Sequence, residues 1–316
     1  MIVSLDMSRM NKILWVDKDN MIACVQAGIR GQDLERDLKM SGVVSGMEPD
    51  SSEYSTLGGW CATRASGMKK NTYGNIEDIV QGMTFVTSKG TYKKNDHWPR
   101  ISAGPDINQL ILGQEGNYGV VSEVIIRVRP VPEVMNFASI IFPNFEIGQK
   151  FMEEMSKQLV YPSSLRLVDN IQFQFGQSLK PAETSQYKKI INAIKKAYVL
   201  NVAGFKPDEM CAATALFEGG AIDCERREAE MMKIAKKYGG MSGGAENGIK
   251  GYQLTYMIAY IRDFCLLNNV IAESFETSCP WSQVGPLCKN VRQAIFDAGI
   301  LHGQKREDMF VSFRVT

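Results

Sequence analysis

Residues 49–78 read PDSSEYSTLGGWCATRASGMKKNTYGNIED, a stretch that is poor in large aliphatic side chains and rich in Gly, Ser and Thr. Glycine has no Cβ, so a ligand can approach its backbone closely. Hydroxyls and backbone N–H groups supply hydrogen-bond donors to a polar ligand. The composition is compatible with a ligand-binding segment and equally with a long turn-rich surface loop.

A second glycine-dense stretch, GQEGNYGVVSE at residues 113–123, has Gly113, Gly116 and Gly119 spaced by three and leads directly into a predicted strand. A glycine turn before a strand can let the backbone pass close to a planar ligand. The same pattern is also typical of a plain β-turn, so this stretch leaves two alternatives open as well.

Composition narrows the class of protein. A chain of 316 residues suffices for about two domains, and 36 basic against 35 acidic residues give no reason to expect a nucleic-acid partner. No uninterrupted apolar run approaches the ~18 residues of a spanning helix. Seven cysteines without a C-x-x-C pair indicate reduced, buried thiols in an intracellular compartment, rather than a disulfide scaffold or a zinc site.

The first part of the chain, up to Glu133, has mainly β patterns. Alternating runs predict strands at 13–17 and 21–28 and a hairpin over 79–94. Leu34 and Leu38 lie at helical spacing before a glycine and predict a short helix over 31–42. Two prolines end the strand pattern of 120–133, so we expect one domain over 1–133 and another over 134–316.

The second part alternates strands with helices. A strand before Pro143, a helix over 145–159 and a strand over 164–169 form a β–α–β order. A strand at 213–219 is followed by a helix over 224–240, and two long helices are expected at 249–269 and 281–299. The glycine-rich residues 241–248 match no phosphate-binding motif and are expected to be a flexible connector.

The side chains offer little chemistry of their own. The two histidines, His97 and His302, both lie in polar segments typical of solvated loops. No Ser–His or Cys–His pair has recognisable spacing, and no cluster of His, Cys and carboxylates predicts a metal site. Any reaction catalysed by this chain would therefore require an organic cofactor.

Two arginines occupy apolar surroundings. Arg262 has apolar or small residues one helical turn away on both sides, which predicts a guanidinium along a buried stripe. A buried charge needs a partner, either Glu273 or Glu276 of the same chain or the carboxylate or phosphate of a ligand. Arg166 alternates with two leucines on a predicted strand and leaves the same alternatives open.

Together these segments resemble the alkyldihydroxyacetonephosphate synthase family, flavoproteins of the vanillyl-alcohol-oxidase type. The blocks that carry the resemblance run through nearly the whole chain. They are SLDMSRMNKILWVD, the stretch from Glu48 to Asp78, GPDINQLILGQEGNYGV, IRVRPVPE, LRLVDNIQFQFG, GYQLTYMIAYIRD and ESFETS. The TRASGMKKN block is far more specific than a generic glycine loop.

The resemblance implies an FAD enzyme of ether-lipid synthesis, a homodimer that is peroxisomal and associated with the membrane surface. Such an enzyme exchanges the acyl group of acyl-dihydroxyacetone phosphate for a long-chain fatty alcohol, through an adduct at flavin N5. The implied fold class is α+β, with a truncated vanillyl-alcohol-oxidase-type FAD-binding domain over 1–133. An α/β substrate-binding cap domain would follow over 134–316.

The resemblance also assigns site residues. Arg262, the arginine of YIRD, and Arg166 would face the substrate and bind its phosphate or its leaving carboxylate, and Gly58 and Gly59 would give the flavin clearance. The residues implied to line the flavin are Asp50, Ser51, Ser52, Glu53, Tyr54, Ser55, Thr56, Gly58, Gly59, Thr63, Arg64, Ala65, Ser66, Glu115, Gly116, Asn117, Tyr118, Gly119, Val120 and Val121.

Some family features are not within this sequence. The family's diphosphate-binding glycine loop would precede Met1, and its catalytic tyrosine and histidine cluster would follow Thr316, so we expect a chain cut at both ends. Asn117 and Tyr118 stand where the family usually has Thr and Leu, and Tyr118 is expected to crowd the flavin. Two alternatives therefore remain, a 2-hydroxy-acid dehydrogenase of the same flavin fold and a non-catalytic remnant that binds a partner.

Overall fold

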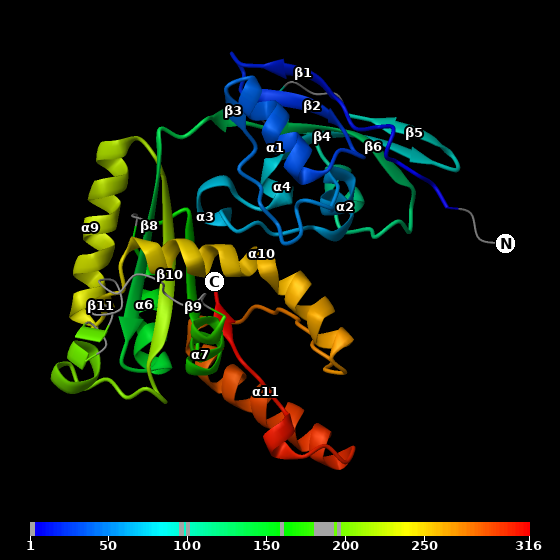
Figure 1. The fold of residues 1–316 in the computed structure, drawn as a ribbon. Coiled ribbons are helices and arrows are strands. Elements are labelled where there is room, and N and C mark those ends of the chain that lie inside the picture. The colour runs from blue at the N-terminus through cyan, green and yellow to red at the C-terminus, as the bar shows by residue number, and fades with distance from the viewer. Residues whose placement is uncertain (1–3, 95–97, 99–101, 159–160, 180–192, 195–196) are drawn as a thin grey trace. The chain divides into compact units, whose positions relative to one another are not determined.

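The computed structural model describes residues 4–94, 98, 102–158, 161–179, 193–194 and 197–316, and His97 lies outside these ranges. The chain forms two compact units, Met1–Glu133 and Val134–Thr316 (Figure 1). None of the helices in the described residues is both long and apolar enough to cross a membrane.

The first unit is built on an antiparallel sheet with strand order β1-β2-β6-β4-β5. These strands are β1 (Ile13–Asp17), β2 (Ile22–Gln26), β6 (Val120–Arg127), β4 (Val80–Thr87) and β5 (Gly90–Lys93). A short ribbon pairs β3 (Val43–Val44) with β7 (Arg129–Pro130). The two N-terminal strands and the β4–β5 hairpin are confirmed.

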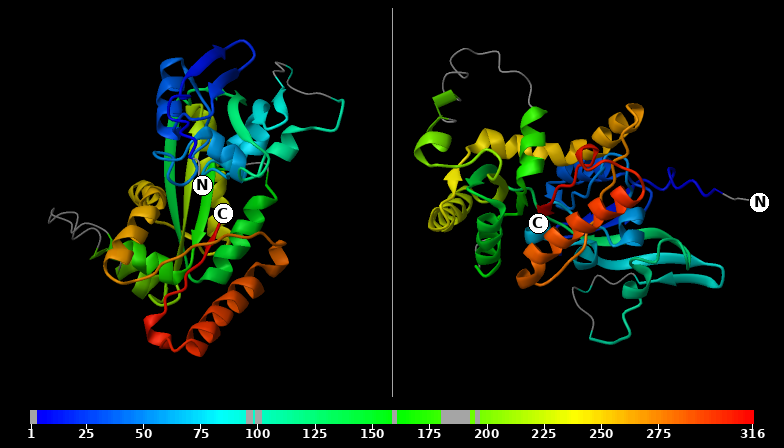
Figure 2. Two further views of the ribbon diagram at one scale, coloured as in Figure 1. Left: turned by 90° about the vertical axis from the view of Figure 1, so that its right-hand side faces the viewer. Right: turned by 90° about the horizontal axis from the view of Figure 1, so that it is seen from below.

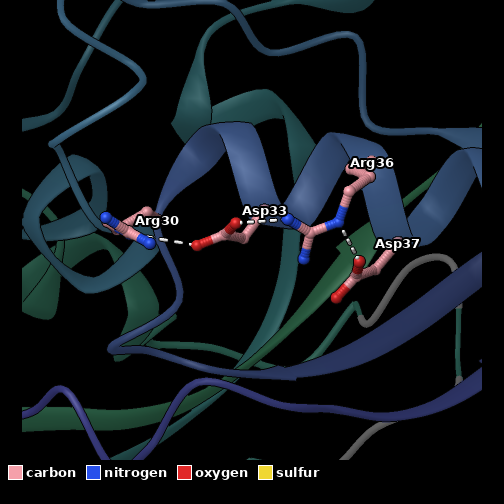
Figure 3. A network of polar contacts seen from close by, with 4 residues as sticks. All are labelled: Arg30, Asp33, Arg36 and Asp37. Carbon is pink, nitrogen blue, oxygen red and sulfur yellow. Dashed lines mark hydrogen bonds and ion pairs between the residues drawn. The ribbon is translucent and has the colours of Figure 1, made fainter.

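The described residues of this unit form five helices: α1 (Gly31–Met40), α2 (Leu57–Thr63), α3 (Lys70–Tyr73), α4 (Ile76–Ile79) and α5 (Asn108–Ile111). Leu34 and Leu38 of α1 are fully buried, as their spacing predicts. On its outer side Asp33 accepts hydrogen bonds from Arg30 and Arg36, and Arg36 also binds Asp37 (Figure 3). The helix therefore has one apolar and one charged side.

Alternation along β2 and β6 divides the apolar residues of the first unit between two faces of the sheet. Val25 and Ile126 belong to the large core that includes the helix leucines. Ile22, Cys24 and Ile125 form a small cluster with Trp15. Because side chains in a strand point alternately to opposite faces, the centre of the sheet is buried on both sides.

The second unit contains a sheet with order β11-β8-β10-β9-β12, in which all neighbours are antiparallel. Its strands are β8 (Val134–Phe142), β9 (Ser164–Val168), β10 (Cys211–Gly219), β11 (Met241–Ser242) and β12 (Arg314–Val315). Strands β8 and β9 therefore run parallel to each other with β10 between them. The predicted β–α–β order is present as β8, α6 (Phe145–Ser156) and β9.

Helices cover both faces of this sheet (Figure 2). Gly148 of α6 lies against Leu167 and Cys211 on one face, and Gly251 of α10 lies against Thr214 on the other. The further helices and turns are α7 (Asn170–Ser178), α9 (Ala221–Lys237), α10 (Ala245–Leu267), α11 (Trp281–Leu301), a π-helical turn η1 (Tyr198–Val202) and a 3-10 turn η2 (Arg306–Asp308).

Two expectations were wrong. Residues 241–248 are not a flexible connector, because they contain β11 and the first turn of α10. The Gly243 N–H donates to the Ser139 carbonyl at 2.8 Å, and a Cβ on Gly248 would lie 2.7 Å from the Ala138 carbonyl oxygen. These glycines therefore allow close packing of the backbone.

The expectation that all seven thiols are buried was also wrong. The thiols are free, but only four are buried, and Cys265, Cys279 and Cys288 are half-buried.

Candidate functional site

The segment 50–56 is held over the N-terminus of α1. The Gly31 N–H donates to the Ser55 carbonyl at 3.0 Å, and the Gln32 N–H donates to the Ser52 carbonyl at 3.1 Å. The first N–H groups of a helix have no partner inside the helix, so these carbonyls satisfy them. The Trp60 indole N–H also donates to the Ser55 hydroxyl at 2.8 Å. The segment is thus tied to the core of the first unit.

The two glycines of α2 have different surroundings. A Cβ on Gly58 would lie 3.0 Å from both the Cβ and the carbonyl oxygen of Ala27, so this glycine is required for packing inside the unit. Gly59 is exposed, and the only described atom near its added Cβ is the Thr56 hydroxyl oxygen, at 3.3 Å. Clearance for a ligand is therefore available at Gly59, whereas Gly58 packs inward.

The two glycine-rich stretches meet at the C-terminus of α2. The Gly113 N–H donates to the Cys61 carbonyl and the Glu115 N–H to the Ala62 carbonyl, both at 2.9 Å. The last carbonyls of a helix lack intrahelical partners, and here the second stretch supplies them. Arg64, at φ +51°, ends the helix in a left-handed conformation. Residues 50–66 and 113–121 therefore form one surface, which we call the glycine surface.

Gln114 organises this surface, although no sequence pattern pointed to it. Its side chain is only 6% exposed. Its Oε1 accepts from the Tyr118 N–H at 3.0 Å and its Nε2 donates to the Gly119 carbonyl at 3.4 Å. The Asn117 side-chain amide donates to the Gln114 carbonyl at 2.7 Å. A buried glutamine therefore holds the turn that precedes β6, while the Tyr118 side chain is 68% exposed.

The chemistry of the glycine surface suits a planar, polar ligand. Its exposed residues include Gly59, Thr63 and Ser66, which are small or carry hydroxyls. The hydroxyls are already oriented: Thr63 donates to the Gly59 carbonyl at 2.9 Å, and Ser66 to Asn75 Oδ1 at 2.8 Å. Complete burial raises the pKa of Cys61 to about 12, so this residue offers no thiolate. The residues present therefore fit a flavin ring, and Cys61 supplies no thiolate beside it.

Arg166 lies in β9 of the second unit and is 9% exposed. It pairs in register with Thr214 of β10, the residue against which Gly251 of α10 packs. Its side chain therefore belongs to the α10 face of the sheet, as the alternation with two leucines predicts.

The predicted burial of Arg262 was wrong. Its side chain is 52% exposed and its Nη1 lies 3.9 Å from Glu273 Oε1, so one of the two expected protein partners is present, at long distance. The described part of the apolar stripe around it is open as well, because Leu266 is 54% exposed and Cys265 is only half-buried. The helix pattern correctly placed these residues on α10, but periodicity alone could not show that their side chains are exposed. His302 is exposed at the end of α11, as predicted.

Comparison with protein families places flavin-related signatures over both units. The family described as "FAD binding domain" matches residues 1–95. The family described as "FAD linked oxidases, C-terminal domain" matches residues 131–309, which is more than half of the chain.

The chain is also similar to individual proteins. It is 51% identical over 292 residues to alkyldihydroxyacetonephosphate synthase of Caenorhabditis elegans, covering 92% of this chain and 49% of that protein. A solved structure of alkyldihydroxyacetonephosphate synthase superposes with a TM-score of 0.82 at 32% identity, covering 94% of this chain and 53% of the other. D-lactate dehydrogenase of Anaerostipes hadrus is 28% identical, covering 70% of this chain and 48% of that protein. The chain spans about half the length of the curated relatives it matches.

Proposed function

This chain belongs to the FAD-linked oxidases, and we propose that it acts as an alkyldihydroxyacetonephosphate synthase that holds FAD on the glycine surface. The observation that carries the proposal is the contact between the two glycine-rich stretches that resemble flavin-binding segments. They are far apart in sequence and are joined by backbone hydrogen bonds to the carbonyls of Cys61 and Ala62. The 51% identity to the nematode synthase supports this activity over that of the more distant dehydrogenase.

In this proposal the first unit binds and orients the cofactor. FAD, when bound, supplies an electron-poor isoalloxazine ring that the side chains of the protein cannot replace. Gly59 would give the ring clearance, and backbone groups of 50–56 and 115–121 would hold it. Residues 50–56 are hydrogen-bonded to the N-terminus of α1, and Gln114 is hydrogen-bonded to the turn before β6. The surface is therefore preorganised for the cofactor.

The second unit would bind acyl-dihydroxyacetone phosphate and the fatty alcohol. Arg262 is suited to the phosphate or to the leaving carboxylate, because its guanidinium is half exposed and its ion pair with Glu273 is long. Arg166 adds a second positive charge on the α10 face of the sheet. We further propose the domain roles implied by the family, with cofactor binding over 1–133 and substrate binding over 134–316, and a peroxisomal homodimer associated with the membrane surface.

The visible absorption spectrum of the purified protein, with and without added FAD, tests the first half of the proposal. We expect flavin bands close to equimolar with protein after excess FAD is removed. A folded protein that stays colourless would refute cofactor binding and leave the alternative of a non-catalytic, partner-binding protein.

Exchange of the acyl group of acyl-dihydroxyacetone phosphate for a labelled long-chain alcohol tests the second half. Release of fatty acid together with a labelled ether product is the expected result. Flavin reduction by D-lactate or glycolate without ether formation would favour the 2-hydroxy-acid dehydrogenase instead.

A further inference from the structure

An ion pair is buried inside the first unit, next to the glycine surface but outside it. Lys69 Nζ lies 2.7 Å from Glu48 Oε1, and the two side chains are only 8% and 20% exposed. Lys69 belongs to the GMKKN block and immediately precedes α3. Neither residue is among those expected to contact the flavin.

A second carboxylate completes the cluster. Glu35 of α1 accepts from the Ser45 N–H at 3.0 Å and from the Ser45 hydroxyl. The Ser45 hydroxyl oxygen in turn accepts from the Met47 N–H at 3.1 Å. Burial raises the pKa of Glu35, while the positive charge of Lys69 acts in the opposite direction. Lys69 thus lies within the electrostatic field of carboxylates from two separate segments.

The backbone around the Lys69–Glu48 pair is tightly packed. The Met68 N–H donates to the Glu48 carbonyl at 2.8 Å. A Cβ on Gly67 would lie 3.0 Å from the Met47 sulfur, and one on Gly46 would lie 2.1 Å from the ring of Tyr73. Residues 45–48 and 67–73 are therefore packed directly against each other. A displacement of one segment must be transmitted to the other.

Both segments continue into the glycine surface. Glu48 is two residues before Asp50, where the segment 50–56 of the glycine surface begins. Lys69 is three residues after Ser66, where the segment 63–66 ends. From this placement we propose that Lys69 is a positioning residue for the flavin, which acts through Glu48 to set the spacing between 50–56 and 63–66. The inference rests on the proposed function, because it presupposes that FAD binds to the glycine surface.

Stability alone does not account for this pair. Replacing a buried ion pair by apolar side chains of similar volume is often neutral or stabilising, because the charges no longer have to be desolvated. An ion pair does, however, fix the separation of its two partners through a short, directional contact. A role in geometry therefore explains the buried charges better than a role in holding the fold together.

The test is FAD affinity, measured by titration of flavin fluorescence and by the position of the long-wavelength absorption band of the bound flavin. Lys69→Met and Glu48→Gln are each expected to weaken FAD binding on the order of tenfold, as loss of a supporting contact around a site does. Arg36→Met is the matched control, since it breaks exposed ion pairs on the residue next to Glu35. We expect it to change the affinity less than twofold.

The double variant Lys69→Met/Glu48→Leu separates positioning from folding. It removes both charges of this pair and leaves Glu35 hydrogen-bonded to Ser45, so we expect its thermal midpoint to recover relative to Lys69→Met while its FAD affinity stays low and its flavin band stays shifted. Recovery of affinity together with stability would overturn the inference and assign the pair a purely structural role. If Lys69→Met does not fold, Glu48→Gln and the double variant give the same comparison.

Wild-type protein that binds FAD while Lys69→Met binds it equally well would refute the positioning role alone. Wild-type protein that folds but does not bind FAD would overturn the proposed function and this inference together. Weakened binding in both single variants, with the Arg36→Met control unchanged, would establish Lys69 and Glu48 as supports of the cofactor site.

Discussion

Alanine at Gly119 is expected to damage the first unit more than alanine at Gly116, although both glycines lie in the same turn. A Cβ on Gly119 would lie 2.3 Å from the backbone oxygen of Val86 in β4 and 3.0 Å from the Phe85 ring. A Cβ on Gly116 would meet no described atom within 4 Å, and its φ of +81° is the only obstacle. The pair therefore separates a steric clash from a backbone preference.

The expected magnitudes follow from these contacts. Gly116→Ala should lower the unfolding free energy by about 1 kcal/mol, because alanine must adopt a left-handed backbone conformation there. Gly119→Ala adds the cost of overpacking, ~1–3 kcal/mol, because a strand backbone cannot rotate aside as a flexible side chain can. We therefore expect a loss of about 3 kcal/mol for Gly119→Ala, since the turn must move away from β4.

Urea unfolding followed by circular dichroism measures both losses, and an FAD titration of each folded variant shows the effect on the glycine surface. Gly42→Ala is a suitable control, since Gly42 follows α1 at φ +79° with no described atom within 4 Å of an added Cβ. Equal destabilisation at Gly119 and Gly116 would refute the reasoning, because it would mean that the contact with β4 relaxes at no cost. FAD binding unchanged in Gly119→Ala would remove the turn from the cofactor site.

Three further results are expected. Ser55→Ala should lower the unfolding free energy by about 1 kcal/mol by removing the acceptor of the Trp60 indole N–H, and Trp60→Phe should cost more because it also leaves a cavity in the core, whereas adding Ser55→Ala to Trp60→Phe should cost little, as a double-mutant cycle by urea unfolding would show. Arg262→Met should change stability by no more than ~0.5 kcal/mol, because its ion pair is exposed and long, yet it should abolish calorimetrically measured binding of dihydroxyacetone phosphate; retained binding would contradict the substrate role. Cys61 has a folded-state pKa of about 12, above its usual 9.0, so its contribution to stability is fully present below pH 9 and is lost as the pH rises toward 12. The stability advantage of wild type over Cys61→Ala should accordingly shrink by up to about 1.4 kcal/mol per pH unit above pH 9, and a constant difference in urea unfolding between pH 8 and pH 10.5 would contradict this.

Local patterns were sufficient for much of the fold. Leu34 and Leu38 placed α1 because a helical stripe needs only residues one turn apart. Alternation and a Lys-Gly turn located the β4–β5 hairpin, and the run ATALFEG at 213–219 located β10. For the glycine surface, the residues themselves pointed to a ligand, whereas the assignment to a flavin came from family resemblance.

The features that the sequence missed depend on contacts between distant segments. The exposure of Arg262 depends on which elements cover the end of α10, and helical periodicity carries no information about that. Residues 241–248 looked flexible because glycine serves both freedom and close packing, and only their contact with β8 distinguishes the two. The Lys69–Glu48 pair joins two segments of opposite charge whose proximity no local pattern indicates.

The position of β10 between β8 and β9 has a consequence for the order in which the second unit folds. Cys211 of β10 pairs with Phe142 of β8, and Leu216 pairs with Ser164 of β9, so the central strand joins the sheet after both of its neighbours have been made. During synthesis, the edges of β8 and β9 that pair with β10 stay unpaired until β10 has left the ribosome. Sheets closed by such long-range pairing fold slowly and expose edges prone to aggregation, so this unit is expected to need chaperones while β10 is still being made.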